Sequence, residues 1–298
     1  SDVYKRQIYF RILPQKWKYF FGAWSGLVMV SVLTTYQHHF IDIPTGLLLG
    51  LFCLWLWPLD GGHRVQTATW QLHGRRVFFA LVYGGLTVGL TIAAFYGGAW
   101  LWLLWPAVSF GMVALGYAVL GADVFAKNGR GVMPWHTQLL LWPYLICARL
   151  NARLWTQHDG TPVEIANGVY VGPLRAANCE GGGEYGIVID MAAELPRRIG
   201  HNGWRSFPVL DLTPPPDDVL ENAVQTIQHV VHHGGHGKIL IACALGYGRS
   251  ITVAAAWLVK SGTCKSAANA VDLLKQKRPR LRLSPAQIAA IERAAQRR

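Results

Sequence analysis

The sequence predicts a two-part protein, with an N-terminal α-helical bundle of about four transmembrane spans followed by an α/β domain whose central sheet is flanked by helices. The first observation is the charge, since only 15% of the 298 residues are charged and long uncharged stretches lie before residue 125. The second is the change near residue 160, where the composition becomes ordinary and short β-rich runs begin to alternate with helical patterns. The third is a strand, loop and helix sequence around Cys243.

The uncharged stretches predict the membrane spans. Residues 77–122 form 46 consecutive positions without Asp, Glu, Lys or Arg. Each candidate span approaches the roughly 20 apolar residues needed to cross a bilayer, and the second, the shortest, lies between two prolines that punctuate a helix. The candidate spans are residues 18–37, 43–58, 77–96 and 99–121.

The basic residues predict the orientation. They lie before the first span, between the second and third, and after the fourth, whereas the other two connections contain no Lys or Arg. By the positive-inside rule these basic segments are cytoplasmic, and so is the C-terminal domain, beneath a bacterial-type inner or plasma membrane. The net charge of +12 partly reflects this basic collar, and no dense basic stripe indicates nucleic-acid binding.

A Trp-rich amphipathic stretch, residues 133–157, joins the two parts and carries Arg149 and Arg153 near its end. We expect a helix that lies on or enters the inner membrane surface. A short fifth span and a linker helix packed on the soluble domain are the alternatives. The predicted organisation is a transmembrane domain at 1–125, an amphipathic juxtamembrane linker at 126–159 and a soluble domain at 160–298.

Within the soluble domain, β-rich runs and amphipathic helical patterns alternate, which is typical of an α/β sheet. Open sheets of this kind usually bind ligands at the carboxyl ends of their strands. The expected strands are 169–171, 187–189, 207–212 and 238–242, and the expected helices are 219–233, 251–259, 266–275 and 285–295.

The chemistry is expected where the strand 238–242 ends. Cys243 is followed by a five-residue loop, then by Arg249, Ser250 and a helix. Loop amides that converge before a helix N-terminus form an anion site, which biases the thiol toward thiolate. A guanidinium can hold two oxygens of a phosphate at once. The five cysteines are scattered without a Cys-x-x-Cys pair, so we expect neither a zinc site nor a disulfide framework. We expect no cofactor and no metal.

Residues 160–298 resemble the dual-specificity and protein-tyrosine phosphatase superfamily, because Cys243-x-x-Gly246-x-x-Arg249-Ser250 matches its phosphate loop. The resemblance implies a metal-independent reaction in which Cys243 attacks phosphorus, Arg249 and the loop amides bind the phosphate oxygens, and Ser250 hydrogen-bonds the sulfur. A simple helix N-cap is the other reading of Ser250, and both can hold. The implied phosphate-binding loop is Ala244, Leu245, Gly246, Tyr247 and Gly248.

The resemblance also requires a general acid, and Asp211, 32 residues before Cys243, is favoured. Asp217 and Asp218 are rivals that would suit the N-terminus of the following helix. Ala242 stands where the family usually has His, so a catalytically weak phosphate-binding membrane scaffold is the alternative to an enzyme. Phosphotyrosine or phosphoserine/threonine proteins are the default substrates, and phospholipids or phosphoinositides at the inner membrane face are the rival class.

A second resemblance concerns residues 15–58. Ser31, His38 and Asp42 resemble the last motif of the type 2 phosphatidic acid phosphatases, although Val32 replaces its arginine. His38 and Asp42 are spaced to share one helical face. The two earlier motifs of that family would lie upstream of residue 1, so we expect a truncated membrane domain with a vestigial site.

Overall fold

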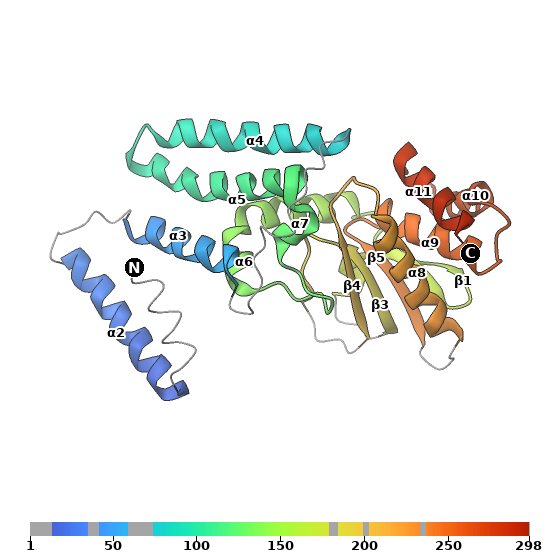
Figure 1. Ribbon diagram of the computed structural model, residues 1–298, viewed down its shortest axis with the longest axis horizontal. Helices are drawn as coiled ribbons and strands as arrows, with labels where there is room; N and C mark the ends of the chain where they lie inside the picture. The colour runs from blue at the N-terminus through green and yellow to red at the C-terminus, as the bar shows by residue number, and fades with distance from the viewer. Residues whose placement is uncertain are drawn as a thin grey trace.

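The computed structural model describes residues 14–34, 42–58, 74–178, 184–198, 203–232 and 237–297. Long helices fill the N-terminal half, and an α/β domain follows (Figure 1). The C-terminal fold class is therefore as predicted.

Helices occupy the predicted spans. Two of them are long and apolar enough to cross a membrane, Arg75–Ala94 and Gly98–Phe125, and Pro44–Leu56 is a shorter apolar helix. The four-span bundle stays a prediction. The bounds are α2 Gln15–Thr34, α3 Asp42–Leu56 and α4 Arg75–Ala94, followed by the consecutive segments η2 Gly98–Leu103, α5 Leu104–Leu115, η3 Gly116–Leu120 and η4 Gly121–Phe125.

The outward side of these helices is apolar. Phe78, Leu81 and Ile92 on α4 are all more than half exposed. The opposite side of α4 packs along α5, which runs beside it in Figure 1. Large apolar side chains on an outer surface are unfavourable in water and favourable in lipid.

The linker forms α6 (Trp135–Leu140) and α7 (Trp142–Trp155). Tyr144, Leu145 and Ala152 of α7 are buried. Ala152 belongs to the apolar cluster on one face of the sheet, so α7 packs on the α/β domain. Four of the exposed apolar side chains of α7 recur every four residues and form one stripe, Trp142, Ile146, Leu150 and Leu154, and the exposed Trp155 follows them.

The sheet has five strands in the order β1-β2-β5-β3-β4, in which β2, β5, β3 and β4 are parallel and β1 is antiparallel to β2. The short strand β1 was not expected from the sequence. Strand β4 ends at Val209, so Asp211 lies in the loop after the strand and not at its end. The bounds are β1 Val163–Ala166, β2 Val169–Pro173, β3 Tyr185–Ala192, β4 Trp204–Val209 and β5 Lys238–Cys243.

The two-residue period of β5 distributes its side chains between two cores. Ile239, Ile241 and Cys243 face the core under the C-terminal helices, whereas Leu240 and Ala242 face the core shared with α7. Cys243 is therefore held at the carboxyl end of the central strand, on the side of α9. The helices of the first core are α8 Asp217–His232, α9 Arg249–Lys260, α10 Ala267–Lys277 and α11 Pro285–Gln296.

Candidate active site

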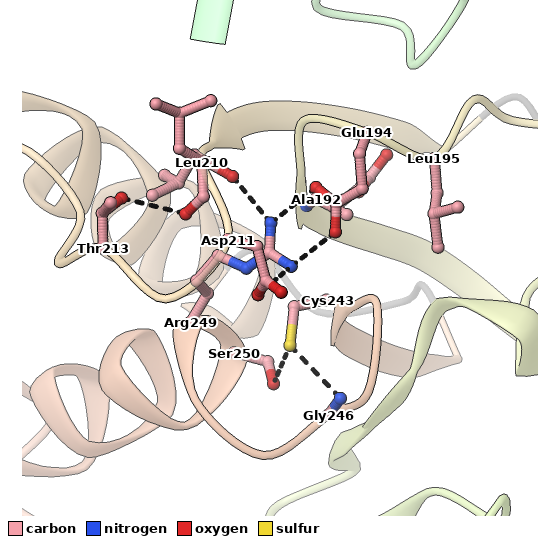
Figure 2. Close-up of polar contacts among 12 residues, drawn as sticks. Ala192, Glu194, Leu195, Leu210, Asp211, Thr213, Cys243, Gly246, Arg249 and Ser250 are labelled. Carbon is pink, nitrogen blue, oxygen red and sulfur yellow. Dashed lines mark hydrogen bonds and ion pairs between the residues drawn. The ribbon is translucent and has the colours of Figure 1, made fainter. Parts of the chain in front are cut away.

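The sulfur of Cys243 lies inside a tight loop that connects β5 to α9. Its side chain is 3% exposed. The amide of Gly246 donates to Sγ at 3.2 Å, and the hydroxyl of Ser250 lies 3.3 Å from Sγ (Figure 2). Two hydrogen-bonding groups, one from the loop backbone and one from α9, therefore contact the same sulfur.

Gly246 is required by the shape of the loop. Its φ is +77°, and a Cβ at this position would lie 2.5 Å from the carbonyl carbon of Gly172. A side chain would therefore both strain the backbone and push the loop away from β2. The glycine keeps the amide of residue 246 directed at the sulfur.

Arg249, the first residue of α9, is buried and held by a carboxylate that the sequence reasoning missed. Its Nη1 and Nη2 atoms donate to the two carboxylate oxygens of Glu194 at 2.8 and 2.7 Å, and Nη1 also donates to the carbonyl of Val209 at 2.7 Å. Burial alone would raise the pKa of Glu194, but the guanidinium outweighs it and lowers that pKa. This bidentate pair fixes the plane of the guanidinium.

Asp211 reaches the same guanidinium. Its Oδ1 accepts from Nη2 of Arg249 at 2.9 Å, and its side chain is 32% exposed, unlike that of Glu194. Burial raises the pKa of Asp211, Arg249 opposes the rise and nearby Glu194 adds to it. Figure 2 shows both carboxylates converging on Arg249 above the sulfur of Cys243. A solvent-reachable carboxyl with a raised pKa is suited to carry a proton.

The rivals of Asp211 lie elsewhere. Asp217 stands in the first turn of α8 and is bound to Arg293 and Arg297 of α11 at 2.9 and 2.6 Å. The hydrogen bonds from Arg293 lower the pKa of Asp217, which suits a permanently charged group. Asp218 is exposed beside it.

The other side of the loop is held by Tyr247. Its hydroxyl donates to Asp159 at 3.0 Å, and the guanidinium of Arg278 lies 5.2 Å from its ring centroid. Arg278 is almost fully buried and also donates to the carbonyl of Val171 on β2. Arg278 therefore joins the loop of Tyr247 to β2.

Ala242 and Ser250 lie on either side of the loop that joins β5 to α9. Ala242 is fully buried and pairs with Asp190 of β3 and Gly172 of β2, so a small apolar side chain fills the place where the resembled family has His. The N-cap of α9 is Gly248, which leaves Ser250 inside the first turn. The N-cap interpretation of Ser250 is therefore wrong, and its contact with the sulfur accounts for its place.

Two further residues connect the loop of Asp211 to the N-terminal helices. The hydroxyl of Tyr117, on η3, donates to the carbonyl of Asp211 at 3.1 Å. Lys127 is fully buried, forms an ion pair with Asp190 at 2.5 Å and donates to the carbonyls of Ala192 and Leu195. A charged residue just after a span was visible in the sequence, but its partner on β3 was not.

The arrangement thus presents a buried thiol, a fixed guanidinium and a carboxyl group at one end of a parallel sheet, which are the parts needed to bind and cleave a phosphate monoester. Among the residues that the structure describes, no group of three or more His, Cys, Asp or Glu could hold a metal ion.

Residues 185–297 match the protein family described as dual specificity phosphatase, catalytic domain. The C-terminal part of the chain is therefore similar to the catalytic domain of dual-specificity phosphatases. No curated protein shows significant similarity to the chain.

Solved structures of phosphatases resemble the same part of the chain. Tk-PTP in its active form is 25% identical, with 47% of this chain and 99% of that chain covered and a TM-score of 0.42. Human DUSP28 is 22% identical, with coverages of 45% and 93% and a TM-score of 0.40. PTPMT1 in complex with PI(5)P is 18% identical, with coverages of 45% and 94% and a TM-score of 0.37.

The resemblance to type 2 phosphatidic acid phosphatases stays a prediction. Ser31 lies in α2 and Asp42 begins α3, whereas His38 lies outside the described residues. The family match at residues 185–297 does not bear on this part of the chain.

Proposed function

We propose that the protein is a membrane-anchored, cysteine-dependent phosphatase that hydrolyses phosphate monoesters through a phosphocysteine intermediate. The observation that carries the proposal is the sulfur of Cys243, hydrogen-bonded by Gly246 and adjacent to Ser250, in a loop that ends at Arg249. The family match of the same region supports the reaction type.

In the first step the thiolate of Cys243 attacks phosphorus, so that a P–S bond forms while the P–O bond to the leaving group breaks. The guanidinium of Arg249 and the loop amides bind the equatorial oxygens, where charge develops. Asp211 gives its proton to the leaving oxygen. Because Arg249 pairs with Asp211, a bound phosphate would compete with that carboxylate for the guanidinium and release the acid.

In the second step water attacks the phosphocysteine, Asp211 accepts the proton of that water, and the P–S bond breaks to give inorganic phosphate. The hydroxyl of Ser250, 3.3 Å from Sγ, would donate to the departing sulfur and stabilise its returning negative charge. The sequence of bonds restores the starting thiolate and the protonated acid.

Membrane anchoring rests on the apolar helices. The helices Arg75–Ala94 and Gly98–Phe125 have the length and composition of membrane spans, and α4 exposes large apolar side chains along its outer side. With the basic segments on the cytoplasmic side, the catalytic domain faces the cytoplasm.

The test is phosphate release from an aryl phosphate by the full chain in detergent. We expect Cys243→Ser to abolish turnover. The matched control Cys264→Ser, which alters a partly buried thiol in the segment after α9, should retain turnover. Turnover that survives Cys243→Ser would overturn the mechanism. Binding of phosphate by the wild-type protein without any turnover would instead favour the phosphate-binding scaffold.

Two matched substitutions test which aspartate is the general acid. Asp211→Asn is expected to lower kcat for a substrate with a poor leaving group by roughly 10²–10⁴-fold. Asp217→Asn removes only the contacts with α11 and should leave kcat unchanged. The reverse result would make Asp217 the acid.

A further inference from the structure

The loop that carries Asp211 packs directly on the apolar helix Gly98–Phe125. Tyr117 donates its hydroxyl proton to the carbonyl oxygen of Asp211 at 3.1 Å. Leu210, next to the acid, and Ala193, next to Glu194, are buried in the same apolar cluster as Tyr117. The catalytic carboxyl group is therefore one contact away from a helix with the composition of a membrane span.

Tyr117 marks a defined depth. A helix needs roughly 20 apolar residues to cross the hydrocarbon core, and counting from Gly98 this brings the chain to about Tyr117. The helix ends at Phe125, and the first basic residue after it is Lys127. A span counted in this way would put Tyr117 where hydrocarbon gives way to headgroups, and the phosphate site beside it at headgroup level.

The catalytic domain is held in this position by direct contacts and not only by a connecting segment of chain. Lys127 and Asp190 form an ion pair in which both side chains are fully buried. Two backbone hydrogen bonds lie nearby: the amide of Ser206 donates to the carbonyl of Gly129, and the amide of Arg197 donates to the carbonyl of Gly131. Separating a buried ion pair is strongly unfavourable because it leaves uncompensated charges. The catalytic domain therefore cannot swing away from the bilayer without breaking these contacts.

Two pairs of arginines lie beside the exposed apolar surfaces of α4 and α7. Arg76, in the first turn of α4, lies within electrostatic reach of Tyr117, and Arg75 beside it is exposed. On α7, Arg149 and Arg153 flank the exposed apolar stripe and are close enough to repel one another electrostatically. Basic residues beside an apolar surface attract anionic lipid headgroups.

We propose that the substrate is a membrane lipid whose headgroup ends in a phosphate monoester, taken from the leaflet at which α4 begins and the helix Gly98–Phe125 ends. A lipid of that leaflet brings its phosphate to the height of Cys243 by diffusion in the plane, whereas a folded phosphoprotein would have to enter the headgroup layer. The P–O bond to the lipid breaks, the dephosphorylated lipid stays in the bilayer, and phosphate leaves to the cytoplasm. The inference rests on the proposed function.

The experiment uses the full chain reconstituted in phosphatidylcholine vesicles. Three probes are compared: a phosphatidic acid or phosphatidylinositol monophosphate in the same vesicles, the same lipid in separate vesicles, and a phosphotyrosine peptide in solution. We expect turnover of a lipid in the enzyme's own bilayer, rising with its mole fraction there, and little turnover of the lipid in separate vesicles or of the peptide.

An aryl phosphate in solution tests the phosphatase function separately from the choice of a lipid as substrate. If neither the aryl phosphate nor any of the three probes is hydrolysed, the proposed function fails. If the aryl phosphate and the peptide are hydrolysed but neither lipid is, the proposed function stands and the lipid inference is overturned.

A charge variant tests whether basic residues attract the lipid headgroup to the site. Arg76→Gln should lower turnover of the lipid by about fivefold and leave the aryl phosphate unaffected, because one basic residue near an anionic surface contributes that much to attraction. The same change at Arg293, which pairs with Asp217 on α11, is the matched control and should affect neither substrate. Equal losses on both substrates with Arg76→Gln would show that Arg76 acts on the fold and would remove this part of the inference.

Discussion

Replacing Glu194 with Gln tests how the buried Arg249 is held. Glu194 accepts two hydrogen bonds from the guanidinium at 2.7 and 2.8 Å, and both side chains are nearly fully buried. Breaking a buried ion pair by removing one partner costs about 3–5 kcal/mol. Because Gln keeps one acceptor oxygen in place, we expect a loss of about 3 kcal/mol, at the lower end of that range.

The same change should affect catalysis in two ways. A guanidinium that loses half of its bidentate support is misplaced relative to the phosphate, and errors of that kind lower kcat by about 10²-fold. The negative charge of Glu194 also contributes to the raised pKa of Asp211. Without it that pKa falls, so the alkaline limb of the pH–rate profile should move toward lower pH.

The assay is kcat/KM for an aryl phosphate across pH, with the thermal unfolding midpoint of the full chain in detergent. Glu221→Gln is the matched control, since Glu221 pairs with Lys260 at 2.6 Å on a partly exposed surface of α8, where an ion pair contributes about 0–1 kcal/mol. An E194Q protein whose rate, midpoint and alkaline limb all coincide with those of the wild type would refute the reasoning.

Three further predictions concern the neighbouring contacts. The rate should decline on the alkaline side at a pH above the ordinary Asp pKa, because burial raises the pKa of Asp211, and Asp211→Asn should flatten that limb in a pH profile. Lys127→Met should lower the unfolding midpoint more at neutral than at acid pH. Burial already raises the pKa of Asp190, and a carboxyl whose folded pKa is raised loses stability as pH rises. Tyr117→Phe removes one hydrogen bond to the acid loop, worth about 1 kcal/mol, and should lower kcat by up to about fivefold, whereas Tyr83→Phe in the same aromatic cluster should not.

The sequence by itself determined the reactive loop and its setting. Cys243, Gly246, Arg249 and Ser250 are neighbours in the chain, so their spacing and the flanking strand and helix already specify a phosphate cradle. The uncharged stretches likewise indicated where the apolar helices lie. These features depend on local geometry, which a short stretch of chain encodes.

Only the tertiary structure decided what holds the site and where it lies. Glu194 is 55 positions from Arg249, and Tyr117 is 94 positions from Asp211, so neither contact has a local pattern that could reveal it. Which acidic residue reaches the guanidinium depends on the parallel pairing of β3 and β4, whereas Asp217 pairs with arginines of α11. The burial of Lys127 against Asp190 and the contact of Tyr117 with the loop of Asp211 likewise depend on packing between the two halves.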